Sequence, residues 1–190
     1  EPGLSRLVAV KLLQDRGLLE GEMRERFLRE IKMMAAVSHS HLVKLYRSGE
    51  EAGQPFLVME HVTGRPVSDA LAASLAQRLD WFRQVVSAVG ELHRMGIIHR
   101  DLKPGNILVE EGTGRAILID LGLARLLETD SQLTRTGVIL GTPYFIPPEA
   151  WTGAGVPGPA YDIYALGVIL YLFLSHRLPY GEGASERQLE

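Results

Sequence analysis

Short apolar runs alternate with longer stretches of helical periodicity along the 190-residue chain. Strands are predicted at residues 7–13, 42–46 and 56–59, because each run is short and rich in β-branched or aliphatic residues. Residues 49–55 are expected to form a hairpin loop between the second and third strands. This first part of the chain therefore predicts a small antiparallel sheet.

Helical spacing dominates elsewhere. Residues 18–37 predict a helix, because four apolar residues recur at steps of three to four, namely Met23, Phe27, Ile31 and Met34. A short helix is expected at 68–76 and a longer one at 79–95, ended by Gly96. Five residues of the longer helix are spaced for a buried face: Phe82, Val85, Val86, Val89 and Leu92. The most apolar stretch, 163–174, predicts a buried helix, since it is shorter than the roughly 18 residues of a membrane span.

A polar cluster lies between further short apolar runs, at 97–98, 107–109 and 116–119. It consists of His99-Arg100-Asp101-Leu102-Lys103-Pro104-Gly105-Asn106, with Asp120-Leu121-Gly122 just downstream. Acids, bases and an amide on tight loops between strands are typical of a reaction site.

Composition narrows the class of protein. A hydrophobic content of 46% and a charged content of 23% favour a soluble globular domain with a real core. The net charge of −3 does not favour nucleic acid as a partner. No cysteine is present, which excludes disulfides and suits a reducing compartment. The chain opens without the features of a signal peptide, so we expect a cytoplasmic location, including that of a cytoplasmic domain of a membrane-anchored receptor.

Three stretches together resemble protein kinases. His99-Arg100-Asp101 with Asn106 matches the catalytic-loop spacing H-R-D-x-x-x-x-N, and Val8-Ala9-Val10-Lys11 resembles the strand that carries the nucleotide-binding Lys. Asp120-Leu121-Gly122 resembles the D-F-G triplet, with Leu121 in place of Phe. The resemblance implies a Ser/Thr protein kinase of the bacterial, eukaryotic-like type.

The resemblance assigns chemical roles. Asp101 would accept the proton of a substrate hydroxyl, and Lys103 would neutralise charge on the transferred γ-phosphate. Asn106 and Asp120 would bind Mg²⁺, or Mn²⁺ in its place. Lys103, two residues after the loop Asp, favours Ser or Thr over Tyr as acceptor.

ATP is the cofactor that the resemblance implies. Lys11 would pair with its inner phosphates, and Glu30 would hold Lys11. Glu30 lies at the edge of the inward apolar helix stripe, where a carboxylate needs a partner; a solvated helix acid is the alternative. Residues 60–64 would form the hinge that contacts adenine, although the pattern also fits an ordinary loop. The full predicted set for ATP is Ala9, Lys11, Glu30, Met59, Glu60, Val62, Leu108 and Asp120.

Residues 125–142 show little periodicity, and long irregular connections tend to be functional. The resemblance makes this stretch an activation loop, with Thr134 and Thr136 as phosphorylation sites, Thr142 as a regulatory residue near the acceptor site, and Arg100 as the phosphate's partner. Solvent-exposed loop threonines are the simpler alternative.

The predicted fold class is α+β, a two-lobe kinase-like fold. Residues 1–59 would form the small lobe, 60–64 the hinge and 65–190 the large lobe, with Asp162 as a structural residue beneath the catalytic loop. The Gly-x-Gly-x-x-Gly pattern at 153–158 is interpreted as a plain loop, because it follows a helix and lies far downstream of Lys11. A Gly-rich loop would precede Lys11 and further helices would follow residue 190, so we expect a partial kinase domain.

Two functions follow from this interpretation. The first is a Ser/Thr protein kinase with a protein substrate, no nucleic-acid partner, no membrane contact from this segment, and dimerisation for autophosphorylation. The 190 residues by themselves would then be weakly active or inactive. The second is a catalytically inactive kinase-like module for interaction or nucleotide sensing. Retention of five residues favours the first: Lys11, Glu30, Asp101, Asn106 and Asp120.

Overall fold

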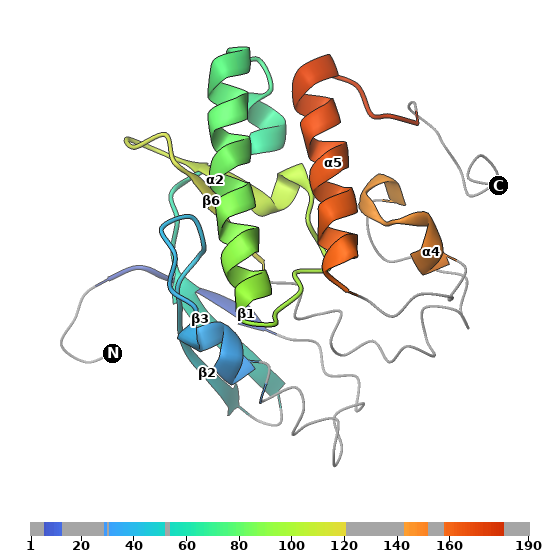
Figure 1. Ribbon diagram of the computed structural model, residues 1–190. Coiled ribbons are helices and arrows are strands. Elements are labelled where there is room, and N and C mark those ends of the chain that lie inside the picture. Colours follow the sequence, from blue (N-terminus) through green and yellow to red (C-terminus); the bar gives the residue numbers. More distant parts are fainter. Residues whose placement is uncertain are drawn as a thin grey trace.

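Two three-stranded antiparallel sheets and two long helices dominate the computed structural model (Figure 1). The model describes residues 6–12, 29, 31–51, 54–120, 143–151 and 158–180. The α+β class predicted from the sequence is confirmed by this arrangement.

The first sheet contains β1 (Val8–Leu12), β2 (Leu45–Glu51) and β3 (Gln54–Glu60) in the order β1-β3-β2. The side chains of β1 alternate as a strand requires: Ala9 and Lys11 are half-buried, while Val8, Val10 and Leu12 are exposed. The face of β1 that carries Lys11 therefore points toward the rest of the molecule.

The second strand differs from its prediction. It begins at Leu45 and continues through Gly49 to Glu51, a stretch expected to form a loop. Gly49 lies opposite Phe56, and a Cβ on Gly49 would come within 2.5 Å of the Phe56 ring. The glycine thus makes room for an aromatic ring inside the strand pair, which a pattern of turn residues does not reveal. Leu42 instead forms an isolated parallel bridge with Leu118 of the second sheet.

Of the helix predicted at 18–37, the described part includes residues 31–36, which are helical. Ile31 and Met34 are buried there, as their place in the apolar stripe predicts. Met23 and Phe27 of the same stripe lie outside the described residues.

The second sheet contains β4 (Gly64–Pro66), β5 (Ile107–Glu110) and β6 (Ala116–Leu118), in that order. The prediction of a helix at 68–76 is wrong. A single 3-10 turn, η1 (Val67–Ala70), follows β4, and α2 starts at Leu75. Ser74 fixes that start, because its hydroxyl accepts the N–H of Gln77 and so caps the helix.

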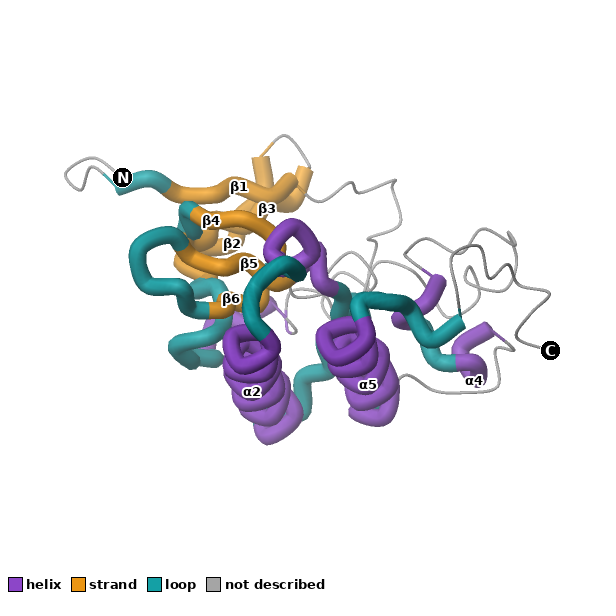
Figure 2. Tube along the Cα trace, turned by 90° about the horizontal axis from the view of Figure 1, so that it is seen from above, coloured by secondary structure: helices purple, strands orange, loops and turns teal. Residues whose placement is uncertain are grey.

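Helices α2 (Leu75–Arg94) and α5 (Pro159–Ser175) lie side by side and pack on each other (Figure 1). Figure 2 shows the strands layered to one side of this pair, with β6 against α2. The buried core joins α2 and α5 to the inner strands, through Val85, Leu92 and Ile169 among others. No helix in the described ranges is long and apolar enough to cross a membrane.

The predicted buried faces of both helices need correction. Val86 of α2 is 40% exposed, and Ile163 and Leu174 of α5 are 62% and 53% exposed. One neighbouring helix covers only one side of α5. Among the described residues, the apolar α5 therefore keeps an exposed side.

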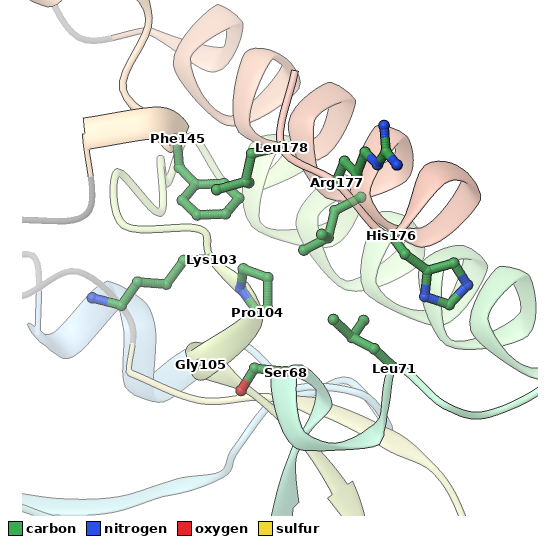
Figure 3. A pocket seen from close by; sticks show the side chains of 10 residues that line it. Ser68, Leu71, Lys103, Pro104, Gly105, Phe145, His176, Arg177 and Leu178 are labelled. Carbon is green, nitrogen blue, oxygen red and sulfur yellow. The ribbon is translucent and has the colours of Figure 1, made fainter. Parts of the chain in front are cut away.

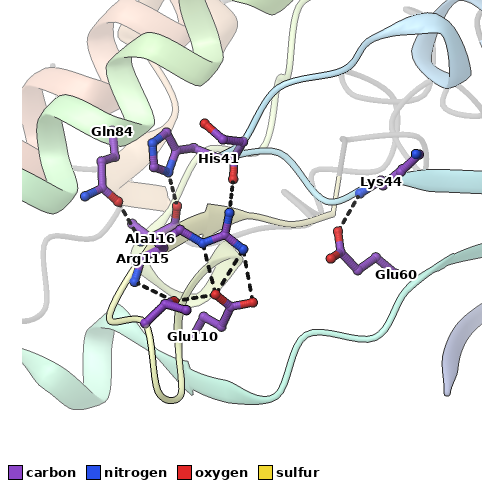
Figure 4. Close-up of polar contacts among 9 residues, drawn as sticks. His41, Lys44, Glu60, Gln84, Glu110, Arg115 and Ala116 are labelled. Carbon is purple, nitrogen blue, oxygen red and sulfur yellow. Dashed lines mark hydrogen bonds and ion pairs between the residues drawn. The ribbon is translucent and has the colours of Figure 1, made fainter. Parts of the chain in front are cut away.

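Residues 40–43, which precede β2 in the chain, are fixed against the second sheet by polar contacts (Figure 4). Arg115 pairs with Glu110 and donates to the backbone oxygen of Ser40 at 3.3 Å. The Leu118 N–H donates to the His41 oxygen at 2.9 Å, and Ala116 donates to the Gln84 side chain at 2.8 Å. The hydrogen bond from Arg115 lowers the pKa of Glu110 below its ordinary value. Residues 40–43 are thus attached to the second sheet through Arg115 and Leu118.

Candidate functional site

Asp101 lies at the centre of a small polar network. Its carboxylate accepts a hydrogen bond from Lys103 Nζ at 3.0 Å and another from Asn106 Nδ2 at 2.9 Å. The Asn106 amide also donates to the Asp101 backbone oxygen at 2.8 Å. The turn η2 (Pro104–Asn106) brings these residues back toward Asp101, with proline at its first position, where its fixed φ suits a helical turn. The carboxylate is therefore held in one orientation before any substrate arrives.

A second carboxylate fixes the backbone of this loop from below. Asp162, near the start of α5, is 1% exposed and accepts the N–H groups of His99 at 2.8 Å and Arg100 at 2.9 Å. His93 of α2 contacts the same carboxylate at 2.8 Å. Arg100 has a φ of 64°, a left-handed conformation that costs a non-glycine residue energy. The two hydrogen bonds that Asp162 accepts from the backbone stabilise that conformation, as predicted for Asp162 from the resemblance.

The side chain of His99, the first residue of this loop, is fully buried. Its Nδ1 atom accepts the backbone N–H of Asp101 at 3.3 Å. Burial lowers the pKa of His99, and the nearby carboxylates of Asp162 and Asp101 oppose that effect only in part. The imidazole is therefore neutral at physiological pH and acts as a hydrogen-bond acceptor that helps to position Asp101.

Asp120 and Lys11 form the other half of the site. The two side chains form an ion pair that joins β1 to the end of β6. Asp120 has a φ of 60°, again in the left-handed region. The N–H of the preceding residue, Ile119, donates to the backbone oxygen of Asn106 at 2.8 Å, so Asp120 is attached to the catalytic loop. Mg²⁺ prefers oxygen ligands such as carboxylate and amide oxygens, and Asp120 and Asn106 supply one of each kind.

The predicted ATP-binding residues are partly brought together. Ala9 lies directly opposite Met59 in the β1–β3 pair, and Lys11 is two residues further along the same face. Glu60 ends β3, and its carboxylate accepts the Lys44 N–H at 3.3 Å. Val62 follows in the irregular stretch 61–63, and Leu108 lies half-buried in β5 of the second sheet. Of the residues predicted to form the hinge, 61–63 are irregular, whereas Glu60 belongs to β3 and Gly64 to β4.

Several predicted residues lie outside the described residues: Glu30, Leu121, Gly122, Thr134, Thr136, Thr142 and all but Gly158 of the 153–158 loop. The predicted contact of Lys11 with Glu30 and the phosphorylation sites therefore stay predictions.

Sequence reasoning missed His93 and the direct ion pair of Lys11 with Asp120. A weak signal existed for His93, because it follows the buried Val89 by four residues and so lies on the inner face of α2. No local signal pairs Lys11 with a residue 109 positions away.

Comparison with known proteins agrees with this geometry. Residues 3–190 match the family model described as protein kinase domain. The chain is 38% identical over 184 residues to the serine/threonine-protein kinase Pkn2 of Myxococcus xanthus, covering 93% of this chain and 22% of that protein. It is 39% identical over 175 residues to the DNA damage-responsive serine/threonine-protein kinase RqkA of Deinococcus radiodurans, covering 88% and 26%.

A further relative is the serine/threonine-protein kinase PknA of Mycobacterium tuberculosis, 36% identical over 191 residues, with 95% of this chain and 44% of that protein covered. The chain therefore spans less than half the length of each of these curated relatives.

Proposed function

The chain belongs to the protein kinase family, and on that premise we propose that the protein containing it transfers the γ-phosphate of ATP to Ser or Thr hydroxyls of a protein substrate. Kinases of this family generally use ATP and Mg²⁺. The use of both by this chain is part of the proposal.

One observation carries the proposal: the Asp101 carboxylate is held by Lys103 and Asn106 on a loop that Asp162 fixes from below. Phosphoryl transfer depends on positioning and charge neutralisation more than on covalent chemistry. The substrate oxygen forms a bond to the γ-phosphorus as the bond to the leaving ADP oxygen breaks, and Asp101 takes up the hydroxyl proton. Lys103 offsets charge on the phosphoryl group during this step.

Lys11 and Asp120 have complementary tasks in this proposal. Asp120 and Asn106 would hold Mg²⁺, which offsets phosphate charge, and Lys11 would contact the inner phosphate oxygens. The ion pair between Lys11 and Asp120 compensates both charges before nucleotide binds. Both side chains are about one-third exposed. On nucleotide binding, Lys11 would exchange Asp120 for phosphate, and Asp120 would exchange Lys11 for the metal ion.

Regulation by phosphorylation is a further part of the proposal. Arg100 Nε is buried and lacks a hydrogen-bond partner within the described ranges. A buried guanidinium nitrogen without a partner is costly, and a phosphate on Thr134 or Thr136 would supply three acceptor oxygens. A cytoplasmic location and dimerisation for autophosphorylation stay predictions.

The alternative of a catalytically inactive module is less well supported. Such a module has no need to orient a carboxylate through two side-chain donors, as Lys103 and Asn106 do for Asp101. Lys11 and Asp120 are retained as well.

A phosphorylation assay with the full-length protein tests the proposal. Radiolabelled ATP, Mg²⁺ and a serine-rich protein acceptor should give phosphoserine or phosphothreonine, and Asp101→Asn should lower the rate about 100-fold or more, as expected for loss of a general base. Asp69→Asn, an exposed carboxylate on η1, is the matched control and should keep its rate. A full-length protein that binds ATP but transfers no phosphate would favour the module.

A further inference from the structure

Residues 37–44 connect the helix at 31–36 to β2, and two histidines attach this connection to different parts of the molecule. His39 Nε2 lies 3.1 Å from the Ser87 hydroxyl oxygen of α2. His41 Nδ1 lies 3.0 Å from the backbone oxygen of Ala116, the first residue of β6 (Figure 4). One imidazole therefore joins the connection to α2, and the other joins it to the second sheet.

The hydrogen bonds of His39 determine its protonation state. Its Nδ1 atom accepts the backbone N–H of His41 at 3.2 Å, so Nδ1 carries no proton. A neutral imidazole then has its proton on Nε2, which donates it to the Ser87 hydroxyl. A proton added to Nδ1 would place two N–H donors against each other. The conformation of His39 in the structure therefore requires a neutral ring.

The contact of His41 has no such requirement. A carbonyl oxygen only accepts, so Nδ1 of His41 carries a proton that it donates to Ala116. A second proton would bind to Nε2 and leave that contact intact. The backbone hydrogen bonds between this connection and β6 do not titrate: the Leu118 N–H donates to the His41 oxygen, and the Val43 N–H donates to the Leu118 oxygen, both at 2.9 Å. Acid therefore affects the attachment to α2 and spares the attachment to the second sheet.

The charged groups around the two rings are already compensated in part. Glu91 of α2 favours a charged His39, but Glu91 is itself paired with Arg94. Other charged residues near the rings come from α2, from both sides of the β2–β3 pair and from the start of β6: Asp80, Lys44, Glu60 and Arg115. The acid of α2 is paired with Arg83, and the arginine before β6 is paired with Glu110. No carboxylate of the described residues accepts a hydrogen bond from the His39 ring.

We propose that His39 is a pH-sensitive attachment of the 37–44 connection to α2, which protonation of the ring releases. The helix at 31–36 packs Ile31 and Met34 into the core and ends directly before this connection. Residues 41–43 stay bonded to β6, so release lets the end of the helix pivot about them. The sheet that carries Lys11 would then shift relative to Asp101 and lower the affinity for ATP. This last consequence rests on the proposed function, whereas the release itself does not.

The direction of the pH dependence follows from the surroundings of the ring. Burial and the neighbouring His41 lower the pKa of His39 below its ordinary value of 6.5, which applies again once the ring is released into water. The attached state is therefore favoured above pH 6.5. It weakens as the pH falls below that value, by at most about tenfold per pH unit. Between pH 7.5 and 5.5 we expect a weakening of about three- to tenfold.

Amide hydrogen exchange of the full-length protein, followed by mass spectrometry, tests the release. After correction for the intrinsic exchange rate, peptides covering 37–41 should lose about three- to tenfold in protection between pH 7.5 and 5.5. His39→Gln keeps a polar group within reach of Ser87 and does not titrate, so this loss should disappear. His39→Asn, which keeps an acceptor for the His41 N–H instead, should also show no such loss.

Two further variants locate the effect. Ser87→Ala replaces an exposed helix residue and removes the partner on α2, so protection at 37–41 should be low at both pH values. His176→Gln is the matched control. His176 lies at the C-terminal end of α5, where it lines a separate cavity of about 770 Å³ (Figure 3). This variant should keep the wild-type pH dependence at 37–41.

ATP affinity, measured by titration calorimetry at the same two pH values, tests the consequence. The affinity of the wild type should fall more than that of His39→Gln, by up to about tenfold. Comparison of the two proteins at each pH cancels the protonation of ATP itself.

The outcomes are distinguishable. The same loss of protection in wild type and His39→Gln, or a full pH dependence in Ser87→Ala, would overturn the inference. An equal loss of protection in peptides from the middle of α2 would show that acid unfolds the whole core, which also overturns it. Equal changes of ATP affinity in wild type and His39→Gln would overturn the link to the nucleotide site. Absence of ATP binding at either pH would contradict the proposed function, while exchange at 37–41 would still report the release.

Discussion

The two halves of the site are built in different ways. The catalytic loop is held by contacts from three directions: Asp162 of α5 below it, His99 within it and Asn106 at its end. The other half depends on β1, an edge strand among the described strands, whose Lys11 pairs with Asp120 within the described residues and whose Val10 is 57% exposed. One half is therefore fixed by buried polar contacts, and the other is positioned mainly by strand pairing.

The difference predicts that substitutions in the two halves will affect different quantities. Under the catalytic loop, loss of a partner leaves buried donors unsatisfied and lowers stability. At β1, loss of a partner exposes a partly solvated charge and changes stability little, although ligand binding suffers.

The largest effect on stability is expected for Asp162→Ala. It leaves the His99 and Arg100 N–H groups and the His93 ring without their acceptor, so we expect a loss of about 3 to 5 kcal/mol in the free energy of unfolding. Chemical denaturation of the full-length protein measures it. The exposed Asp69→Ala control should change stability by less than about 0.5 kcal/mol. Equal effects of the two substitutions would show that Asp162 does not fix the loop.

A smaller, pH-dependent effect is expected from His99. Burial lowers its folded-state pKa below the ordinary value of 6.5, so the unfolded chain binds this proton first as the pH falls. Stability should therefore decrease below about pH 6.5, by at most about 1.4 kcal/mol per pH unit from this residue.

His99→Asn isolates that contribution, because Asn keeps an acceptor near the Asp101 N–H and does not titrate. Denaturation midpoints at pH 7.5 and 5.5 should show a smaller decrease in the variant. His39 also contributes to the pH dependence, because burial and the neighbouring His41 lower its pKa. Its contribution is the same in both proteins, so the difference between wild type and variant reports His99. Parallel pH curves for wild type and variant would contradict the assignment of a neutral, buried His99.

The smallest effect on stability is expected for Lys11→Met. The ion pair with Asp120 is about one-third exposed at both side chains, so its loss should change the free energy of unfolding by less than about 1 kcal/mol. ATP affinity, measured by titration calorimetry, should fall strongly under the same conditions. Lys32→Met, on the exposed side of the helix at 31–36, is the control for both measurements. A loss of stability comparable to that of Asp162→Ala would remove the contrast between the halves.

Local pattern was sufficient for much of the fold. The strands around 8–12 and 107–109 and the helix ending near Gly96 follow from short-range periodicity and turn residues, and the structure confirms them. The errors lie where a distant contact overrides that pattern. Gly49 continues a strand because Phe56 covers it, and 68–76 is no helix because Ser74 caps the next one.

The sequence by itself determined the chemistry of the site: which acids, amides and amines are present, in which order, and at which short spacings around Asp101. Tertiary structure alone decided which partners they have. His93, His99 and Arg100 meet at Asp162, more than 60 positions away, and Lys11 reaches Asp120 across 109 positions. Such pairs depend on how α2, α5 and the two sheets pack, and packing is set by the burial of the whole core rather than by any local stretch.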